Sequence, residues 1–501
     1  MIQKIRQIII YLVRNFFLAT RNIKLCRYFG IGLYKIGLHY AVKKLAKIPE
    51  TEAIYSSTDF NDEDFLPGES DIDLVVVLKK ETAPDIIFDL NQILNKAKNG
   101  INFYFPFFQD IFLFDAQEFY DICHRSERIE HEKKDFDNLI LIWGEDKRKN
   151  LTPGRQEAAP SKRTARIVLM VFMLLVIENH WGQKNLRRVR KFFGHILYLG
   201  FHFKYHRKAK SVQDYLVYMA EIGVPAQFID IFPKLKEFDF DYQYELLPLM
   251  VYSVIKIYES IDKFEKIKND YTTEISDNFT KKPSQELLDF FESVDKKMIK
   301  SIYALSSPYF RNCVNWQQNI YIILNDDIGY GDFKIFFDSF FENLTLLELF
   351  PIRSNPLARI FRKKMPALPS IYFLTDKTFK SPHFFRENEA GELDLFGYKI
   401  FGDNIDFSAA SNRFVGKLFE NENNMGCYSR ASEFLSFDDE IIDAITKAVK
   451  FFRIAEEKRL FFYGDIDKKY KEIYGEDGPD INDKKDIYRF FYEHAIKNRF
   501  K

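Results

Sequence analysis

Two aspartates at the start of an apolar run constrain this chain more than any other feature. The run from Ile72 to Leu78 is aliphatic and β-branched, has the length of a strand, and follows turn-forming residues between Thr58 and Gly68. On a strand, residues i and i+2 point to the same side, so Asp71 and Asp73 present two carboxylates together. Such a pair needs a cation, and hard oxygen ligands suit Mg²⁺. Asp-x-Asp by itself also fits a solvated strand edge.

The flanking sequence predicts an alternation of helices and strands. Pro84 to Ala97 has the pattern of an amphipathic helix, and Ile101 to Phe105 and Asp110 to Phe114 are predicted strands. A further apolar stretch, Leu139 to Trp143, ends in Gly144-Glu145-Asp146. This alternation of predicted helices and strands indicates an α+β fold with a mixed sheet.

These motifs resemble the DNA polymerase β superfamily of nucleotidyltransferases, particularly its minimal, aminoglycoside-adenylyltransferase-like branch. The signature of that superfamily is a Gly-Ser turn, a spacer of about a dozen residues and a strand that carries Asp-h-Asp. Tyr55-Ser56-Ser57 stands at the turn, Ser70-Asp71-Ile72-Asp73 follows the spacer, and Asp110 and the Gly144-x-Asp146 pattern come later. The resemblance covers residues 51–150 and implies the nucleotidyltransferase fold.

The resemblance also implies a chemistry. A nucleoside monophosphate, AMP first among the candidates, would pass from ATP or another triphosphate to an acceptor hydroxyl, with release of pyrophosphate. Asp71, Asp73 and Asp110 would be the catalytic residues and the ligands of two Mg²⁺ ions. Ser56, Ser57 and Ser70 would contact the nucleotide. Ser56 departs from the pattern, because glycine usually stands at that position and permits close approach of phosphate.

Two assignments stay open at this stage. Asp115 competes with Asp110 for the third carboxylate position, although its place at the end of the apolar run also suits a helix N-cap. Lys184 and Arg188 begin a basic stretch that continues through Lys210. We consider three interpretations of these cations, in decreasing order of preference: a solvated helix face, neutralisation of the triphosphate, and contact with an RNA backbone.

The C-terminal half contains segments similar to those of the first. Asn319 and Tyr321 align with Asp71 and Asp73, Ser370 aligns with Asp110, and Gly402 aligns with Gly144. In this alignment the second copy lacks carboxylates and is catalytically dead. The predicted domains are therefore N-terminal helices (1–50), a catalytic domain (51–150), a helical domain (162–300), a degenerate nucleotidyltransferase-like domain (301–405) and a C-terminal helical domain (406–501).

Composition limits the partners. Lys plus Arg and Asp plus Glu number 73 each, so no global field draws the molecule to nucleic acid. The scattered cysteines and the absence of a signal-peptide pattern predict a cytoplasmic protein without a membrane span. An amphipathic helix near the N-terminus could touch a membrane surface, although packing on the core is the favoured use of its apolar face. The acceptor stays open between a small molecule, a protein and RNA, and the alternative function is a non-catalytic nucleotide-binding or scaffold protein.

Overall fold

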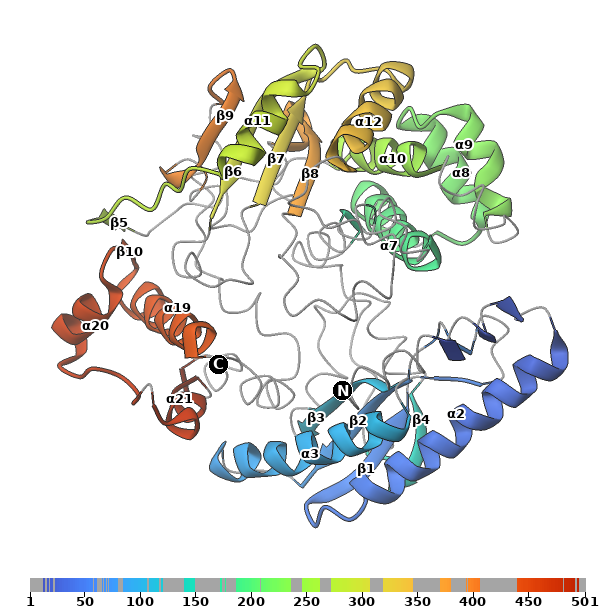
Figure 1. Ribbon diagram of the computed structural model, residues 1–501, viewed down its shortest axis with the longest axis vertical. Coiled ribbons are helices and arrows are strands. Elements are labelled where there is room, and N and C mark those ends of the chain that lie inside the picture. The colour runs from blue at the N-terminus through green and yellow to red at the C-terminus, as the bar shows by residue number, and fades with distance from the viewer. Residues whose placement is uncertain are drawn as a thin grey trace. The chain divides into compact units, whose positions relative to one another are not determined.

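The computed structural model contains most of the helices and strands that the sequence predicts (Figure 1). The described residues are 23–56, 58–60, 72–79, 84–105, 108–116, 139–148, 186–207, 209–235, 246–261, 272–306, 319–345, 370–379, 395–405, 439–480 and 482–491, with a few isolated positions besides. The chain divides into two compact units, of which unit 1 comprises residues 1–159, 419–453 and 470–501 and unit 2 comprises residues 160–418 and 454–469. Much of the predicted C-terminal helical domain thus belongs to the unit that holds the first sheet.

Unit 1 contains a four-stranded mixed sheet in the order β3-β2-β1-β4. Strand β1 (Thr51–Ser56) pairs antiparallel with both β2 (Ile72–Leu78) and β4 (Ile140–Gly144), and β2 pairs in parallel with β3 (Phe108–Asp115). The predicted strands at 72–78 and 110–114 are confirmed. So is the α+β fold class, since helices and mixed sheets alternate along the chain.

Helices α2 (Lys24–Leu45) and α3 (Pro84–Tyr104) contact each other and the strands β1 and β3. The predicted strand at 101–105 is wrong, because these residues form the end of α3. Leu90, Leu94 and Ile101 are buried at helical spacing, and the Phe105 N–H donates to the Ile101 carbonyl oxygen at 2.8 Å. A run of apolar residues too short to show its period can be read as either element.

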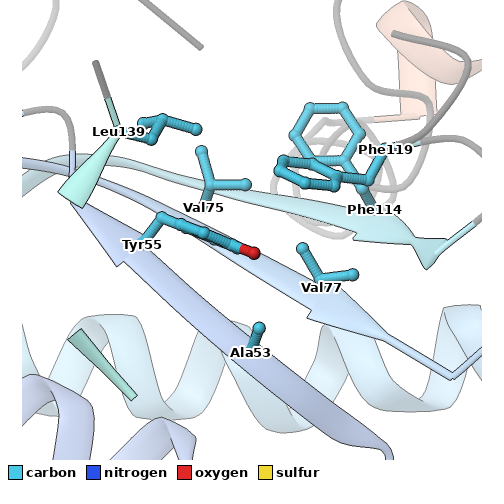
Figure 2. Close-up of a cluster of buried hydrophobic side chains, with 7 residues drawn as sticks. All are labelled: Ala53, Tyr55, Val75, Val77, Phe114, Phe119 and Leu139. Carbon is cyan, nitrogen blue, oxygen red and sulfur yellow. The ribbon is translucent and has the colours of Figure 1, made fainter. Parts of the chain in front are cut away.

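The opposite face of the sheet carries a core cluster that includes Tyr55, Val75 and Phe114. Figure 2 shows these side chains together on one side of the strands, with Ala53, Val77, Phe119 and Leu139. The Tyr55 and Phe119 rings stack with centroids 5.2 Å apart. Alternation along β2 gives Asp73 the same face as Val75.

Unit 1 also includes helix α21 (Lys484–Phe491), which packs against α3. Arg489 holds Asp85 through two hydrogen bonds, from Nε at 3.0 Å and from Nη2 at 2.9 Å. Beside this ion pair the rings of Phe88 and Tyr488 lie 5.7 Å apart. Residues about 400 positions apart in sequence are thereby joined in one unit.

Unit 2 begins with helices and then forms a second mixed sheet. Its described helices before that sheet are α7 (Leu186–Tyr205), α8 (Val212–Glu221), α9 (Ala226–Ile231), the 3₁₀ helix η1 (Phe232–Lys234), α10 (Leu247–Glu259) and α11 (Gln285–Ser293). A separate two-stranded parallel sheet joins β5 (Thr272–Ile275) to β10 (Leu460–Tyr463). Helix α19 (Asp439–Lys458), most of which belongs to unit 1, precedes β10, and α20 (Ile466–Tyr474), which returns to unit 1 at Tyr470, follows it. The segment from Gly464 to Asp483 is rich in charged residues with Gly and Pro, a composition that predicts an exposed loop. This prediction is wrong where α20 lies, because Ile466 and Tyr470 are buried on one side of that helix.

The second mixed sheet has the order β8-β7-β6-β9 and is built from β6 (Ile299–Leu305), β7 (Asn319–Leu324), β8 (Ser370–Thr375) and β9 (Tyr398–Gly402). Strand order and pairing sense are the same as in the first sheet. Helix α12 (Tyr330–Thr345) links β7 to β8 as α3 links β2 to β3, and the short helix α14 (Asp376–Phe379) follows β8. Several α12 phenylalanines surround the Phe373 ring of β8.

The described residues contain no helix that is both long and apolar enough to span a bilayer.

Candidate functional site

The pairing of β2 with β3 brings two of the predicted carboxylate positions to the same level of the sheet. Ile72 pairs with Phe108 and Leu74 pairs with Ile111, so residue 73 lies opposite two residues, Gln109 and Asp110. Two residues against one is the arrangement of a β-bulge, which often adjusts the aim of a side chain. Asp73 is partly exposed. The Asp110 side chain and the whole of Asp71 lie outside the described residues.

Asp115, the competing third carboxylate, lies at the other end of the strand pair. It is opposite Leu78, the last residue of β2. Five residues of a parallel strand separate it from Asp110, which corresponds to about 16 Å. The two aspartates of β3 therefore cannot serve one small site together with Asp73.

The loop before β2 is held by helix α2, through a residue that the sequence analysis did not identify. Tyr34 donates a hydrogen bond from Oη to the Ser70 carbonyl oxygen at 2.8 Å and accepts one from the Gly68 N–H at 3.0 Å. Its ring meets Phe65 edge to face, with centroids 5.1 Å apart. Tyr34 thus fixes the backbone that immediately precedes Asp71. The sequence indicates that Tyr34 belongs to a helix with one apolar side, but it does not identify the loop that Tyr34 contacts.

Close packing of the same helix against this loop requires a glycine. A Cβ on Gly30 would lie 2.6 Å from the Pro67 Cβ, closer than such atoms approach in proteins. Helix α2 therefore fits against the 65–70 loop at two successive turns, one with Gly30 and one with Tyr34.

The turn after β1 is closed by a serine side chain. Ser56 is fully buried, and its Oγ accepts a hydrogen bond from the Thr58 N–H at 3.1 Å. This bond is typical of a serine that stabilises the turn it begins. The departure from glycine at position 56 thus has a structural role in the turn. Ser57 lies outside the described residues.

The Gly144-x-Asp146 motif closes the first sheet through Tyr55. Gly144 has a φ of +85°, which favours glycine, and it ends β4 opposite Ala53. Tyr55 donates from Oη to Asp146 Oδ1 at 3.2 Å and accepts from the Lys147 N–H at 2.7 Å. Burial raises the pKa of the Tyr55 hydroxyl well above its ordinary value. Asp146 is therefore an anchor of the strand end.

Arg148 completes this anchor. It donates from Nε to Asp146 Oδ1 at 3.0 Å and from Nη1 to the Leu139 carbonyl oxygen at 2.6 Å, and its guanidinium lies 5.1 Å from the centre of the Tyr55 ring. The guanidinium holds the pKa of the Asp146 carboxyl below its ordinary value. Both ends of β4 are thereby tied to one cation.

The basic stretch of the helical segment lies in unit 2. Lys184 lies outside the described residues, and Arg188 is in α7 without a described side chain. Further along the stretch, Lys204 pairs with Glu221 at 2.8 Å and Arg207 pairs with Asp214 at 3.1 Å. These two cations make ion pairs on the surface of their own unit, as expected for a solvated face.

The second sheet has neutral residues at the corresponding positions. Tyr303 pairs with Tyr321 as Tyr55 pairs with Val75, which places Asn319 at the position of Asp73. The expected alignment of Asn319 with Asp71 and of Tyr321 with Asp73 is therefore wrong by two residues, because strand register and not residue similarity sets the equivalence. Ser370 pairs with Asn319 and keeps its predicted equivalence to Asp110.

The strand ends of the two sheets also correspond. Gly402 has a φ of +84° and lies opposite Ser301, as Gly144 lies opposite Ala53. Tyr303 accepts a hydrogen bond from the Ile405 N–H at 3.2 Å, which is the counterpart of the bond between Lys147 and Tyr55. The irregularity in each antiparallel pairing also falls at the same place. The repeated Ile-Tyr pairs at 54–55 and 302–303 were the sequence signal for this shared tyrosine.

Among the side chains that the structure describes, no group of three or more His, Cys, Asp or Glu is arranged to hold a metal ion. Asp71 and the Asp110 side chain are not among them. Comparisons with protein-family models, with curated proteins and with solved structures find no match to this chain.

Proposed function

We propose that unit 1 is a Mg²⁺-dependent nucleotidyltransferase that uses Asp71, Asp73 and Asp110. The observation that carries the proposal is the register of β2 and β3, because residue 73 lies opposite the bulge that contains residue 110. Asp71 stands two positions before Asp73 in the sequence, a spacing that would place both carboxylates on one side of an extended chain. Together the three carboxylates would form a hard, anionic donor set, which suits Mg²⁺ and not a soft metal.

The reaction forms a bond between the acceptor oxygen and the α-phosphorus of the triphosphate and breaks the bond from that phosphorus to the bridging oxygen. Pyrophosphate leaves with the bonding electrons, and the acceptor proton passes to Asp110 or to solvent. Mg²⁺ held by the three aspartates would neutralise the triphosphate and lower the pKa of the acceptor hydroxyl. Ser57 and Ser70 are proposed to bind the triphosphate. Tyr34 is the positioning residue for the loop that leads to Asp71.

We infer that the second sheet is a duplicate without activity. The support is the shared strand order, the shared irregularities and the equivalent Gly144 and Gly402. Asn319 and Ser370 stand where the first sheet has Asp73 and Asp110, and neither supplies an anionic oxygen. Only one active site per chain follows from this inference.

The alternative function is a non-catalytic nucleotide-binding or scaffold protein. The buried Ser56 favours it, because its side chain occupies a turn where the superfamily usually has glycine for close approach of phosphate. A scaffold can bind Mg²⁺ and ATP without transferring the nucleotide, so binding alone does not separate the two functions. Transfer of a labelled nucleotide to an acceptor does separate them.

The decisive experiment uses the full chain, Mg²⁺ and a lysate as the source of acceptor. Each nucleoside triphosphate is supplied with label at the α-phosphate and, in parallel, at the γ-phosphate. Nucleotidyl transfer places the α label and not the γ label on the acceptor, whereas a kinase does the reverse. The class of the labelled fraction, small molecule, protein or RNA, identifies the acceptor.

Variants of the aspartates test the site. Asp73→Asn and Asp110→Asn should each lower transfer by about a hundredfold or more, since loss of an outer-sphere partner of a metal ligand alone typically costs about 10- to 100-fold and these residues are proposed as ligands. Asp115→Asn is the matched control on the same strand and should keep activity, because Asp115 lies at the far end of β2 and β3. A folded Asp71→Asn, Asp73→Asn double variant that still transfers label contradicts the proposal.

A further inference from the structure

Helix α2 has two apolar sides, and only one of them is covered. Tyr34, Leu38 and Leu45 are buried on the side that faces the sheet and the 65–70 loop. On the other side Leu25 is 78% exposed and Phe29 is 62% exposed. Tyr28 and Ile36 are exposed as well. Tyr28, Phe29 and Ile36 follow Leu25 by three, four and eleven residues, which are spacings that repeat one side of a helix.

The exposed apolar side chains continue into the preceding segment. Leu12, Val13, Phe16 and Ile23 are also exposed. Single exposed apolar residues are ordinary, but a concentrated group marks a surface that binds something. We call the eight residues Leu12, Val13, Phe16, Ile23, Leu25, Tyr28, Phe29 and Ile36 the apolar stripe.

The charge of the same segment is entirely positive. Residues 1–49 contain ten Lys and Arg residues and no Asp or Glu, although the whole chain has 73 of each sign. The remainder of the chain must therefore carry a net charge of −10. On α2 and just beyond it, Lys24, Lys35, Lys43, Lys44 and Lys47 are exposed. The segment that carries the apolar stripe thus has a net charge of +10, with no carboxylate to offset it.

We propose that the apolar stripe and its surrounding lysines bind the surface of an anionic phospholipid bilayer. Apolar side chains that enter the boundary between headgroups and acyl chains, with cations against the headgroups, are the two components of such binding. Residues 1–49 supply both components on one side of α2. The proposal does not rest on the proposed nucleotidyltransferase activity.

The same observations disfavour the other occupants of this surface. A second copy of the chain would bring two segments of charge +10 together, and like charges oppose association. Nucleic acid would satisfy the lysines through its phosphates but would leave large aliphatic side chains such as Leu25 and Ile36 exposed to water. An anionic bilayer satisfies both the charge and the apolar area.

The test is flotation of the full chain with vesicles of phosphatidylcholine alone and of phosphatidylcholine mixed with phosphatidylserine. The chain should bind the mixed vesicles, and added salt should weaken the binding. Lys24→Gln with Lys43→Gln should lower the affinity about twenty-fivefold, since each cation near such a surface contributes on the order of a factor of five. Leu25→Ser with Phe29→Ser should lower it by at least a comparable factor.

The control variant is Ile335→Ser, an exposed apolar position on α12 that is 72% exposed and lies outside residues 1–49. It should leave vesicle binding unchanged. Circular dichroism establishes that each variant is folded, which is expected because every substituted side chain is exposed. Vesicle binding that is absent, or that is indifferent to both pairs of substitutions, overturns the proposal. So does a dimer or an RNA complex that Leu25→Ser with Phe29→Ser abolishes while no vesicle binding is seen.

Discussion

Replacement of Gly144 by alanine tests the closure of the first sheet. Its φ of +85° is one that alanine adopts only with strain. A Cβ at this position would lie 2.9 Å from the Ala53 Cα and still closer to the Glu52 carbonyl oxygen. Both neighbours are backbone atoms of β1, so no side chain can turn aside to make room. Strand β4 must therefore move away from β1.

The expected loss of stability combines two contributions. A left-handed backbone costs an alanine about 1–2 kcal/mol. Moving β4 would also break at least one or two backbone hydrogen bonds, each of about 1 kcal/mol. Gly475→Ala supplies the matched control in the same unit, because Gly475 has a φ of +73° but a Cβ there meets no atom within 4 Å. We expect Gly144→Ala to destabilise unit 1 by about 2 kcal/mol more than Gly475→Ala does.

Urea unfolding followed by circular dichroism measures the two free energies, and hydrogen exchange of the β1 and β4 amides localises the damage. Gly402 and Gly223 provide the equivalent comparison in unit 2. A Cβ on Gly402 (φ +84°) would clash with backbone atoms, whereas a Cβ on Gly223 (φ +80°) would meet no atom within 4 Å. If Gly144→Ala and Gly475→Ala cost the same free energy, the backbone contact has no energetic role and the argument fails.

Three further predictions concern single side chains. Tyr34→Phe removes two hydrogen bonds to the loop before Asp71, so the free energy of unfolding should fall by about 1–2 kcal/mol. The kcat of the proposed nucleotidyl transfer should fall, with a smaller change in KM. An unchanged unfolding free energy and an unchanged kcat contradict the positioning role. Tyr321→Asp should lower the unfolding free energy by about 3 kcal/mol or more in denaturant melts, because the ring is 1% exposed and stacks on Tyr372 with centroids 5.2 Å apart, whereas Ile335→Asp should be nearly neutral. The lowered pKa of Asp146 stabilises the fold above its unfolded-state pKa, and this advantage over Asp146→Asn should disappear as the pH falls through the folded-state pKa; a pH-independent difference in unfolding free energy would exclude the linkage.

Several elements followed from local sequence alone. The run from Ile72 to Leu78 is β-branched, uninterrupted and bounded by turn residues, and it forms a strand with those bounds. The short strands at 319–324 and 370–375 are equally readable from their aliphatic and aromatic content. Residues 101–105 were not readable in this way, because a segment of five residues with four apolar or aromatic side chains fits both a strand and the last turn of a helix, and tertiary packing of α3 decided between them.

The sequence by itself predicted that a buried strand starts beside two aspartates and that similar segments recur in the second half. It could not determine which residues meet. The bulge that sets residue 110 opposite residue 73, the bonds of Tyr34 to the loop before Asp71, and the equivalence of Asn319 with Asp73 depend on strand register and helix packing. The physical reason is that periodicity specifies which face of an element is buried, whereas contacts between elements distant in sequence are selected only when the whole core packs.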